Sequence, residues 1–454
     1  MLRAPLTLSY TGMHCPRGGL VGWGRALIHN ITKRQKSTGT TYALTLILCG
    51  FVASQAQAQL PVPVQSVDVL HWWTSASERR AADQLSAHLL ANGVQWKDAA
   101  IPGGGGMAAV KVLKSRVLMG DPPDVAQLIG TTLTDWADVG LVMPLNAVAS
   151  RQKWDQGLFP TVMALVTYKG DVIAAPLGIH RINTLLYNRH LFARLGLPPP
   201  RTWDEFEVVA RKLSGMGIKP LAWSDEAWQM ATVFESVLLG EAGPALYSEL
   251  IVQRKSAAWM DPRVEQALTR LRWLRNISGE VPVERTWPDA ARELANNGAA
   301  MMIMGDWAKG ELMAWGASEE RDFGCVAVPG TQKMHLYSID TLAMLVSNRQ
   351  REATQEKLAE LVVGAPAQLT YNRTKGSVPV RRDIDVRSLD TCARDSWSTF
   401  AAPRSARVPS LAHRMAADEA TKDAVAQTLW RYLTNPRMEA REAQARLAIV
   451  IRAP

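Results

Sequence analysis

The stretch DVLHWWTSASERRAADQL, residues 68–85, joins a short apolar strand to a helix. The strand contains Val69–Leu70, and the helix is predicted to begin near Ser77. Trp72 and Trp73 lie between the two. Successive side chains of a strand point to opposite faces, so two adjacent tryptophans cannot both enter one core. Open α/β sheets bind ligands at the carboxyl ends of their strands, so the pair predicts a ligand platform there.

Strand and helix patterns alternate along the rest of the chain, which indicates an α/β fold. Helices are predicted over residues 77–90 and from Thr202, which forms a capping box with Glu205. A buried strand is predicted at Ala300–Met304. The extended stretch at residues 170–188 is typical of a segment that crosses between lobes. Because 454 residues exceed what one hydrophobic core usually supports, two lobes are expected.

The net charge of +9 is concentrated near the N-terminus. Residues 1–58 carry six Lys and Arg and no Asp or Glu, which leaves +3 (9 − 6) for the remainder. A nucleic-acid-binding surface needs a stronger basic excess, so no nucleic-acid partner is expected.

The same leader has the features of a secretory signal peptide. TKRQK is a cationic segment, YALTLILCGFVA is an apolar core too short to span a membrane, and AQA at Ala56–Ala58 is a cleavage signal. We predict a signal peptide at residues 1–58 with an over-extended start, and a mature secreted chain from Gln59. An uncleaved anchor is the alternative.

Two cysteines, Cys325 and Cys392, remain after this cleavage. In an oxidising compartment an even number favours one structural disulfide. Two buried thiols are the alternative. No spacing of His and Cys resembles a metal site, so neither a metal nor a cofactor is expected.

The chain is rich in tryptophan, with 16 Trp against 7 Phe and 8 Tyr. An indole is a broad apolar plate that suits the C–H face of a pyranose, whose hydroxyls then need polar partners around the rim. The Trp72–Trp73 pair fits this chemistry. The alternative is that one indole enters the core and the other covers the sheet edge. For most other tryptophans, including Trp228 and Trp287, helix packing is the favoured interpretation.

Catalytic motifs are missing from the sequence. It contains no GxSxG, no HExxH and no identifiable pair of glycosidase carboxylates. Asp306 is interpreted as a helix cap rather than a ligand group. PGGGG at residues 102–106 is interpreted as a flexible connection before a helix, with an anion site at the helix amides as the alternative.

Seven blocks of sequence together resemble the periplasmic sugar-binding proteins of ABC importers, especially their glucose/mannose-binding branch. The blocks are VLHWWTSASE, WKDAAIPGGGG, AVKVLKSRVLMGDPPDVAQLIG, AAMMIMGDWAKGE, CVAVPGT, KGSVPVR and SLAHRMA. The resemblance covers about residues 65–440 in the same order.

The resemblance implies a two-lobed periplasmic binding protein fold. Each lobe is expected to be a mostly parallel sheet flanked by helices, with the ligand in the cleft between the lobes. Lobe 1 would contain residues 59–178 and 328–370. Lobe 2 would contain residues 179–327 and 371–454.

The resemblance also implies a ligand-binding set. In it, Trp73 and Trp307 would stack on the sugar ring, the carboxylates would accept hydrogen bonds from hydroxyls, and the Lys and His would donate them. The expected set is Trp72, Trp73, Glu78, Gln127, Trp307, Ser338, Asp340, Lys375 and His413.

Two positions depart from the glucose-binding pattern. Ile129 stands where a Lys is common, and Ser338 stands where an Asn is common. Loss of a charged donor and an amide can change which sugar hydroxyls find a hydrogen-bond partner, and each buried polar group left unpaired costs about 1–3 kcal/mol of binding free energy. A different hexose, a disaccharide or a modified sugar therefore remains open.

The function that follows is non-enzymatic. We expect a monomer that captures a monosaccharide, with a glucose-like hexose favoured, and delivers it to the membrane permease of an ABC transporter. One alternative is a binding protein that feeds a sensor or chemoreceptor. Another is a secreted carbohydrate-active enzyme.

Overall fold

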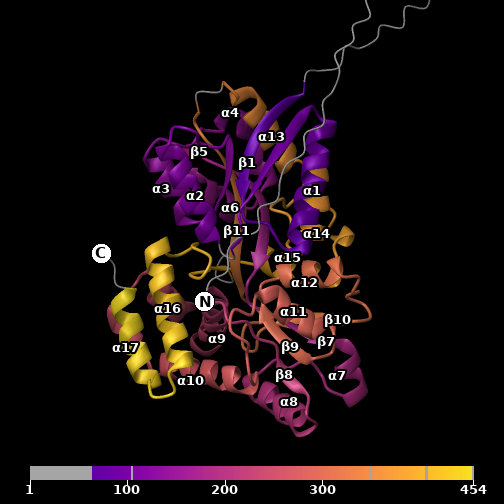
Figure 1. The fold of residues 1–454 in the computed structure, drawn as a ribbon, viewed down its shortest axis with the longest axis vertical. Helices are drawn as coiled ribbons and strands as arrows, with labels where there is room; N and C mark the ends of the chain where they lie inside the picture. The colour runs from indigo at the N-terminus through magenta and orange to yellow at the C-terminus, as the bar shows by residue number, and fades with distance from the viewer. Residues whose placement is uncertain (1–63, 104–105, 348–349, 404–406, 452–454) are drawn as a thin grey trace, which may run out of the picture. The chain divides into compact units, whose positions relative to one another are not determined.

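The computed structural model describes residues 64–103, 106–347, 350–403 and 407–451. The expected signal peptide, residues 1–58, lies outside this part of the chain. Two separate sheets organise the described residues, as Figure 1 shows with β1 and β11 in its upper half and β7 to β9 in its lower half.

The first sheet has the strand order β12-β11-β3-β1-β2, and β6 also pairs with β11. β1 is parallel to both β2 and β3, so the carboxyl ends of these strands lie at one edge. β11 is antiparallel to β3 and β6. The strands are β1 (Gln65–His71), β2 (Val94–Ala100), β3 (Val125–Leu128), β6 (Ala175–Arg181), β11 (His335–Met344) and β12 (Arg407–Pro409).

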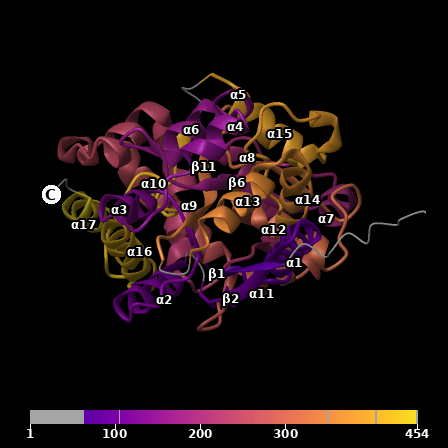
Figure 2. The ribbon, with the colours of Figure 1, turned by 90° about the horizontal axis from the view of Figure 1, so that it is seen from above.

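The helices that belong with the first sheet come from two parts of the chain, and Figure 2 shows them around β1, β2 and β6. The predicted helix at 77–90 is confirmed as α1, and Glu78 Oε2 accepts a hydrogen bond from Ser75 N at 3.1 Å at its start. The helices are α1 (Ala76–Ala91), α2 (Met107–Leu118), α3 (Thr131–Asp138), α4 (Asn146–Arg151), α5 (Trp154–Gly157), α6 (Pro160–Val166), α13 (Glu352–Val363), α14 (Ala365–Lys375) and α15 (Thr391–Ala401). A small hairpin of β4 (Thr167–Tyr168) and β5 (Asp171–Val172) follows α6.

The second sheet has the order β10-β7-β9-β8. Its strands are β7 (Thr184–Asn188), β8 (Lys219–Leu221), β9 (Ala299–Met304) and β10 (Phe323–Ala327). The predicted stretch at 170–188 does cross between sheets, because β6 belongs to the first sheet and β7 to the second.

The α/β class is confirmed, but the second sheet is not mostly parallel. Among its described strands only β8 and β9 pair in parallel, whereas β7 is antiparallel to both β9 and β10. The crossing segment accounts for this difference: β7 enters the second sheet directly from β6 of the first sheet, so its direction is set by that crossing and not by a β-helix-β unit of its own sheet.

Helices also surround the second sheet. The predicted capping box of α8 is confirmed, since Glu205 N donates to Thr202 Oγ1 and Thr202 N donates to Glu205 Oε2, both at 3.2 Å. The helices are α7 (Arg189–Leu195), α8 (Trp203–Gly215), α9 (Ala227–Tyr247), α10 (Pro262–Ile277), α11 (Trp287–Ala295), α12 (Trp307–Ala314), α16 (Glu419–Thr434) and α17 (Ala440–Val450). Short helical turns lie at Ser248–Val252, Ser256–Met260 and Val386–Ser388. No helix in the described ranges is long and apolar enough to cross a bilayer.

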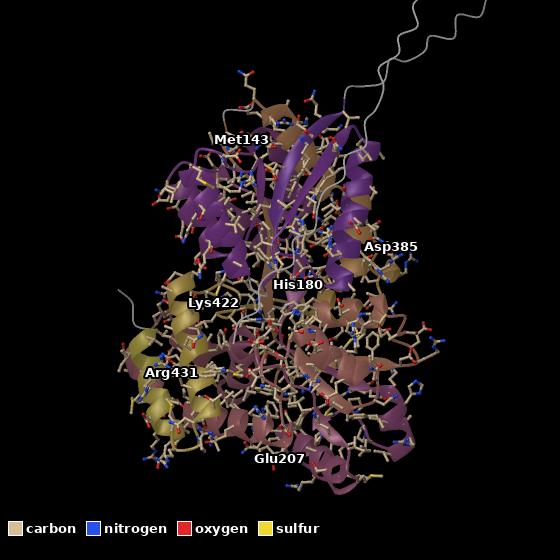
Figure 3. The ribbon with its side chains drawn as sticks, viewed as in Figure 1. Met143, His180, Glu207, Asp385, Lys422 and Arg431 are labelled. Carbon is tan, nitrogen blue, oxygen red and sulfur yellow. A yellow bond between two sulfur atoms is a disulfide. The ribbon has the colours of Figure 1, made fainter. Side chains whose placement is uncertain are left out.

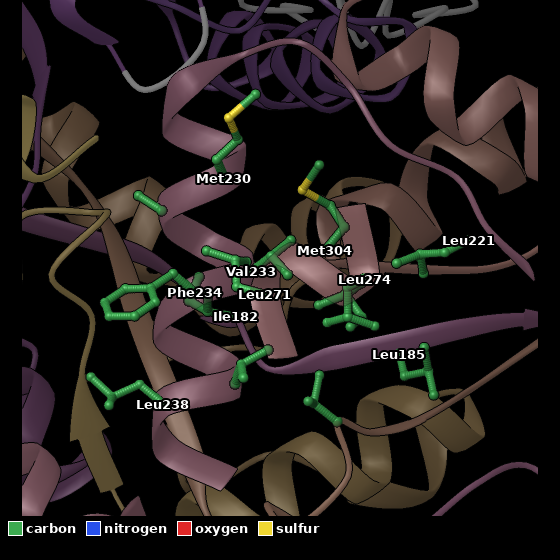
Figure 4. Packing of buried hydrophobic residues seen from close by; sticks show 14 of the residues in the cluster. Ile182, Leu185, Leu221, Met230, Val233, Phe234, Leu238, Leu271, Leu274 and Met304 are labelled. Atoms are coloured by element: carbon green, nitrogen blue, oxygen red, sulfur yellow. The ribbon is translucent and has the colours of Figure 1, made fainter. Parts of the chain in front are cut away.

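Two hydrophobic cores accompany the two sheets. The first core surrounds β1, β3 and β11. The second core packs α9 against the second sheet, and Figure 4 shows Met230 of α9 near Met304 of β9. The strands β3, β6, β7 and β9 are buried at every position, so helices cover both faces of these parts of the two sheets.

The bounds of the lobes stay a prediction, and the cores indicate where such bounds would fall. The break between β6 and β7 lies at residues 182–183, close to the predicted 178/179. After α13, Tyr371, Val378 and Phe400 still belong to the first core, whereas Val408 belongs to the second. On packing grounds the last boundary therefore lies after Phe400 rather than at residue 370.

Cys325 and Cys392 form a disulfide with their Cα atoms 5.9 Å apart. Cys325 lies on β10 of the second sheet, and Cys392 lies on α15, whose Ala393 and Phe400 belong to the first core. The bond therefore joins segments that pack in different cores.

Replacing Cys392 with Ser is expected to lower the free energy of unfolding by about 2–4 kcal/mol, because the unfolded chain loses a cross-link. Urea unfolding of the purified protein measures this loss. A reductant should lower the wild-type value to that of the variant and leave the variant unchanged. Equal stability of the oxidised wild type and Cys392→Ser would show that the disulfide has no such role.

Candidate ligand-binding site

A cavity of about 320 Å³ is lined by residues from both cores. This volume is at the lower end of the range of roughly 300–1,000 Å³ that is usual for small-molecule sites. The lining residues are Trp72, Trp73, Thr74, Ser75, Glu78, Pro102, Gly103, Ile129, His180, Glu226, Trp228, Thr286, Trp287, Pro288, Trp307, Ser338, Asp340, Lys375 and His413.

Eight of the nine residues in the predicted ligand-binding set line this cavity. The exception is Gln127 on β3, which is buried behind the wall. Its Oε1 accepts from Trp72 N at 3.2 Å, and its Nε2 donates to Asp340 Oδ1 at 3.4 Å. Gln127 therefore positions two wall residues and is not part of the wall. Both departures from the glucose pattern, Ile129 and Ser338, do line the cavity.

The expectation that the two adjacent tryptophans cannot both enter one core is wrong, because Trp72 and Trp73 are both buried and both belong to the first core. They follow the end of β1 at His71, so the alternation of side chains along a strand does not apply to them, and their surroundings differ. Trp73 packs against Trp96 and Tyr371, with ring centroids 6.4 and 5.7 Å away. Among the described residues, no hydrogen-bond partner reaches its Nε1. Trp72 lies against Gly106, where an added Cβ would come within 2.7 Å of the indole. The absence of a side chain at Gly106 is therefore required by the position of Trp72.

Lys375 and Glu78 form an ion pair in the cavity wall, with Nζ and Oε1 3.0 Å apart. Burial alone would lower the pKa of Lys375, but the carboxylates of Glu78 and Asp340 outweigh it and raise the pKa above its ordinary value. Lys375 is therefore a charged donor at neutral pH, with hydrogens beyond the one given to Glu78.

His180 lies between two carboxylates at the junction of the cores. Its Nδ1 is 2.6 Å from Asp306 Oδ1, and its Nε2 is 3.3 Å from Asp340 Oδ2. Burial would lower the pKa of His180, but the two carboxylates raise it to about 9. The hydrogen bond and charge of His180 in turn hold the pKa of Asp340 below its usual value despite burial. Figure 3 labels His180 at the level where the two halves of the ribbon meet.

The interpretation of Asp306 as a helix cap is correct for its position, which is the N-cap of α12, but not for its side chain. Asp306 precedes α12, but its side chain caps no amide of that helix. Instead Oδ1 contacts His180, and Oδ2 accepts from Arg181 N at 2.9 Å. The strand residue His180 offers a stronger bond to a buried carboxylate than a helix amide does, because the imidazolium is charged.

His413 follows β12 and also lines the cavity. Burial lowers its pKa to about 3, and nearby Lys422 adds to the effect, so the imidazole is neutral at physiological pH. Nε2 is 3.2 Å from Thr232 Oγ1, and the ring lies 5.1 Å from that of Trp307. The loop that carries His413 is held by Glu235, which accepts from Ser410 Oγ at 2.6 Å.

Comparison with known protein families places the chain. Residues 76–368 match the family model described as bacterial extracellular solute-binding protein. The chain belongs to this family. Like the proteins to which it is similar, it is a solute-binding protein and not an enzyme.

A probable sugar-binding periplasmic protein from Brucella melitensis biotype 1 is 30% identical to this solute-binding protein over 413 residues, which cover 90% of the chain and 98% of the relative. Solved structures share its two-lobed fold. The bacterial solute receptor AcbH, described as having an exclusive preference for β-D-galactopyranose, matches with a TM-score of 0.73 at 18% identity, covering 86% of this chain and 97% of AcbH. Maltose-bound MalE3 from T. maritima matches with a TM-score of 0.70 at 17% identity, covering 85% of this chain and 98% of MalE3.

Glu311 of the solute-binding protein joins the two cores next to the cavity. It lies on α12 and is only 1% exposed. Its carboxylate accepts from Ala76 N at 3.2 Å, from Ser77 N at 2.9 Å and from Ser77 Oγ at 2.8 Å. A carboxylate at a helix N-terminus is favoured by the free amides and the helix dipole. Here the helix belongs to the first core and the carboxylate to the second.

Several wall residues were missed by sequence reasoning. Trp228 and Trp287 were interpreted as packing residues, yet both line the cavity, together with Glu226. The sequence around a tryptophan near a helix start does not show whether the side chain lines a cavity or packs in the core. Trp223 lies only five residues before Trp228, yet it is fully buried and does not line the cavity. His180 was missed because its partners lie 126 and 160 residues away in the chain.

The PGGGG segment only partly falls within the described residues. Pro102 and Gly103 line the cavity, and residues 104–105 lie outside the described ranges. Its interpretation as a flexible connection stays a prediction.

The imidazole of His180 is expected to remain protonated at pH 7.5, since its pKa is raised to about 9. Its stabilising contribution should be fully present below the unfolded pKa of about 6.5 and should be lost as the pH rises through about 9. Nitrogen NMR chemical shifts across this range measure the protonation directly, and the spectrum of His180→Gln identifies the signal. A neutral ring at pH 7.5 would contradict the expected ion pairs.

Replacing Glu311 with Gln is expected to lower the free energy of unfolding by about 1–3 kcal/mol, because a charged acceptor of three buried hydrogen bonds becomes a neutral one. Urea unfolding measures the change. Glu320→Gln is the matched control, because Glu320 is exposed six residues beyond α12. Equal losses in the two variants would show that the contact with α1 contributes nothing.

Proposed function

We propose that the protein captures a sugar in the periplasm and delivers it to the membrane permease of an ABC transporter. The observation that carries this proposal is the chemistry of the cavity wall. It combines indole plates with carboxylates and charged or neutral nitrogen donors, and Trp73 Nε1 is a buried donor with no partner among the described residues. Buried polar groups are normally hydrogen-bonded, so a ligand oxygen is the natural partner of this N–H.

The roles of the wall residues follow from their states. Glu78 and Asp340 are ion-paired carboxylates that can accept from sugar hydroxyls. Lys375 can donate, and neutral His413 can donate from one ring nitrogen. Trp73 and Trp307 would contact the faces of the ring. We propose a glucose-like hexose ring as the unit held by this part of the wall.

The proposed location rests on the leader and on the relatives. Residues 1–58 have the pattern of a cleaved signal peptide, and the Brucella relative is named a periplasmic sugar-binding protein. We further propose that the two lobes close on the ligand by hinge bending, as two-domain binding proteins do, and that the protein acts as a monomer.

Replacing Trp307 with Ala is expected to weaken sugar binding by about 1–3 kcal/mol, as loss of a buried aromatic contact does. Tryptophan fluorescence with D-glucose, galactose, mannose, xylose and maltose identifies the sugar, and calorimetry measures both affinities. Trp430→Ala is the matched control, because Trp430 is exposed on α16 and does not line the cavity. Unchanged affinity in Trp307→Ala, with the fold intact, would contradict the assigned site.

A further inference from the structure

More indoles line the cavity than one sugar ring can use. The five are Trp72, Trp73, Trp228, Trp287 and Trp307. A pyranose has two faces, so at most two of these plates can stack on one ring. The remaining indoles need either a purely structural role or a second ring.

Glu226, Trp228 and Trp287 form a distinct part of the wall, which we call the second wall. Glu226 precedes α9, and Trp287 begins α11, so the residues come from two segments about 60 positions apart. Glu226 Oε1 accepts from Trp228 Nε1 at 3.0 Å, and Oε2 accepts from Trp287 N at 2.6 Å. These bonds fix the carboxylate relative to the indole of Trp228 and to the backbone of Trp287.

The two segments are also tied beside the second wall. Asp225 N donates to Arg285 O at 2.9 Å, and Glu284 N donates to Asp225 Oδ2 at 3.1 Å. Backbone and side-chain hydrogen bonds therefore both hold the two segments together, so the second wall is a structured surface.

Glu226 keeps acceptor capacity for a ligand. Each of its oxygens has one protein donor, whereas a carboxylate offers about four lone-pair sites. Among the described residues no Lys, Arg or His forms an ion pair with Glu226, in contrast to Glu78 and Asp340. Burial raises the pKa of Glu226. A neutral hydroxyl-rich ligand suits this carboxylate, since hydroxyl donors can fill the unused sites.

The second wall adjoins the residues that are proposed to hold a hexose. His180 is 3.3 Å from Asp340, and the ring of Trp307 lies 5.4 Å from His180. The ring of Trp228 lies 6.2 Å from Trp307. The ring of Trp228 also lies 6.1 Å from that of His413. Two of the residues proposed to hold a hexose, Trp307 and His413, therefore adjoin the second wall, and Trp307 can contact two adjoining sugar rings.

We propose that Glu226, Trp228 and Trp287 form a second sugar subsite, and that the preferred ligand is a disaccharide or a glycoside of a hexose rather than a free hexose. This inference rests on the proposed function and specifies its substrate class. Glu226 would accept from hydroxyls of the second ring, and the indole of Trp228 or Trp287 would cover one of its faces.

Calorimetry of the purified protein with glucose, galactose, maltose, cellobiose and lactose tests the proposal. At least one disaccharide is expected to bind about tenfold or more tightly than either hexose. Glu226→Gln and Trp228→Ala should weaken that disaccharide about tenfold and change hexose affinity by less than about twofold.

Trp228→Phe separates the two parts of the second wall. It keeps an aromatic plate and removes the N–H donated to Glu226, so a smaller loss than in Trp228→Ala is expected. Thermal unfolding of each variant checks that the fold is retained.

Two results would overturn the inference while leaving the proposed function intact. One is a hexose that binds as tightly as every disaccharide. The other is a variant of the second wall that weakens hexose and disaccharide equally. Binding of none of the sugars would instead refute the proposed function itself.

Discussion

The contact on which the site depends is the imidazolium of His180 held between Asp306 and Asp340. Asp306 precedes α12 beside the second sheet, whereas Asp340 lies on β11 of the first. Two buried carboxylates without a cation between them would each be costly to desolvate and would repel each other. His180 resolves this at the point where the chain passes from β6 to β7. The same residue thereby fixes the junction of the sheets and the charge of the cavity floor.

The two sides of the cavity use different physical means. On the side of α1 and α14, the charges are paired within the protein, as in Glu78 with Lys375. On the side of α9 and α11, the carboxylate of Glu226 is held by neutral donors and flanked by indoles. The first arrangement directs hydroxyls by charge, and the second relies on shape, apolar contact and unused lone pairs.

Local signals in the sequence predicted the features that depend on neighbouring residues. The strand-to-helix turn at Trp72 and Trp73 and the capping box at Thr202 are of this kind, and resemblance to a family supplied Lys375 and His413. His180 could not be predicted, and Gln127 was predicted to bind the ligand rather than to support two wall residues, because the roles of both depend on residues more than 50 positions away. The antiparallel pairing of the second sheet was missed for a related reason: it follows from how the chain crosses between sheets, which no local pattern records.

The disulfide has a consequence for how the first sheet is assembled. The loop that it closes, from Cys325 to Cys392, contains β11, yet all the partners of β11, namely β3, β6 and β12, lie outside that loop. Because those partners lie outside the loop, pairing of β11 does not join the ends of the loop, and the disulfide closes a separate stretch of chain at its own entropic cost. In the oxidised chain, α15 of the first core therefore stays tethered to β10 of the second sheet while β11 finds its partners.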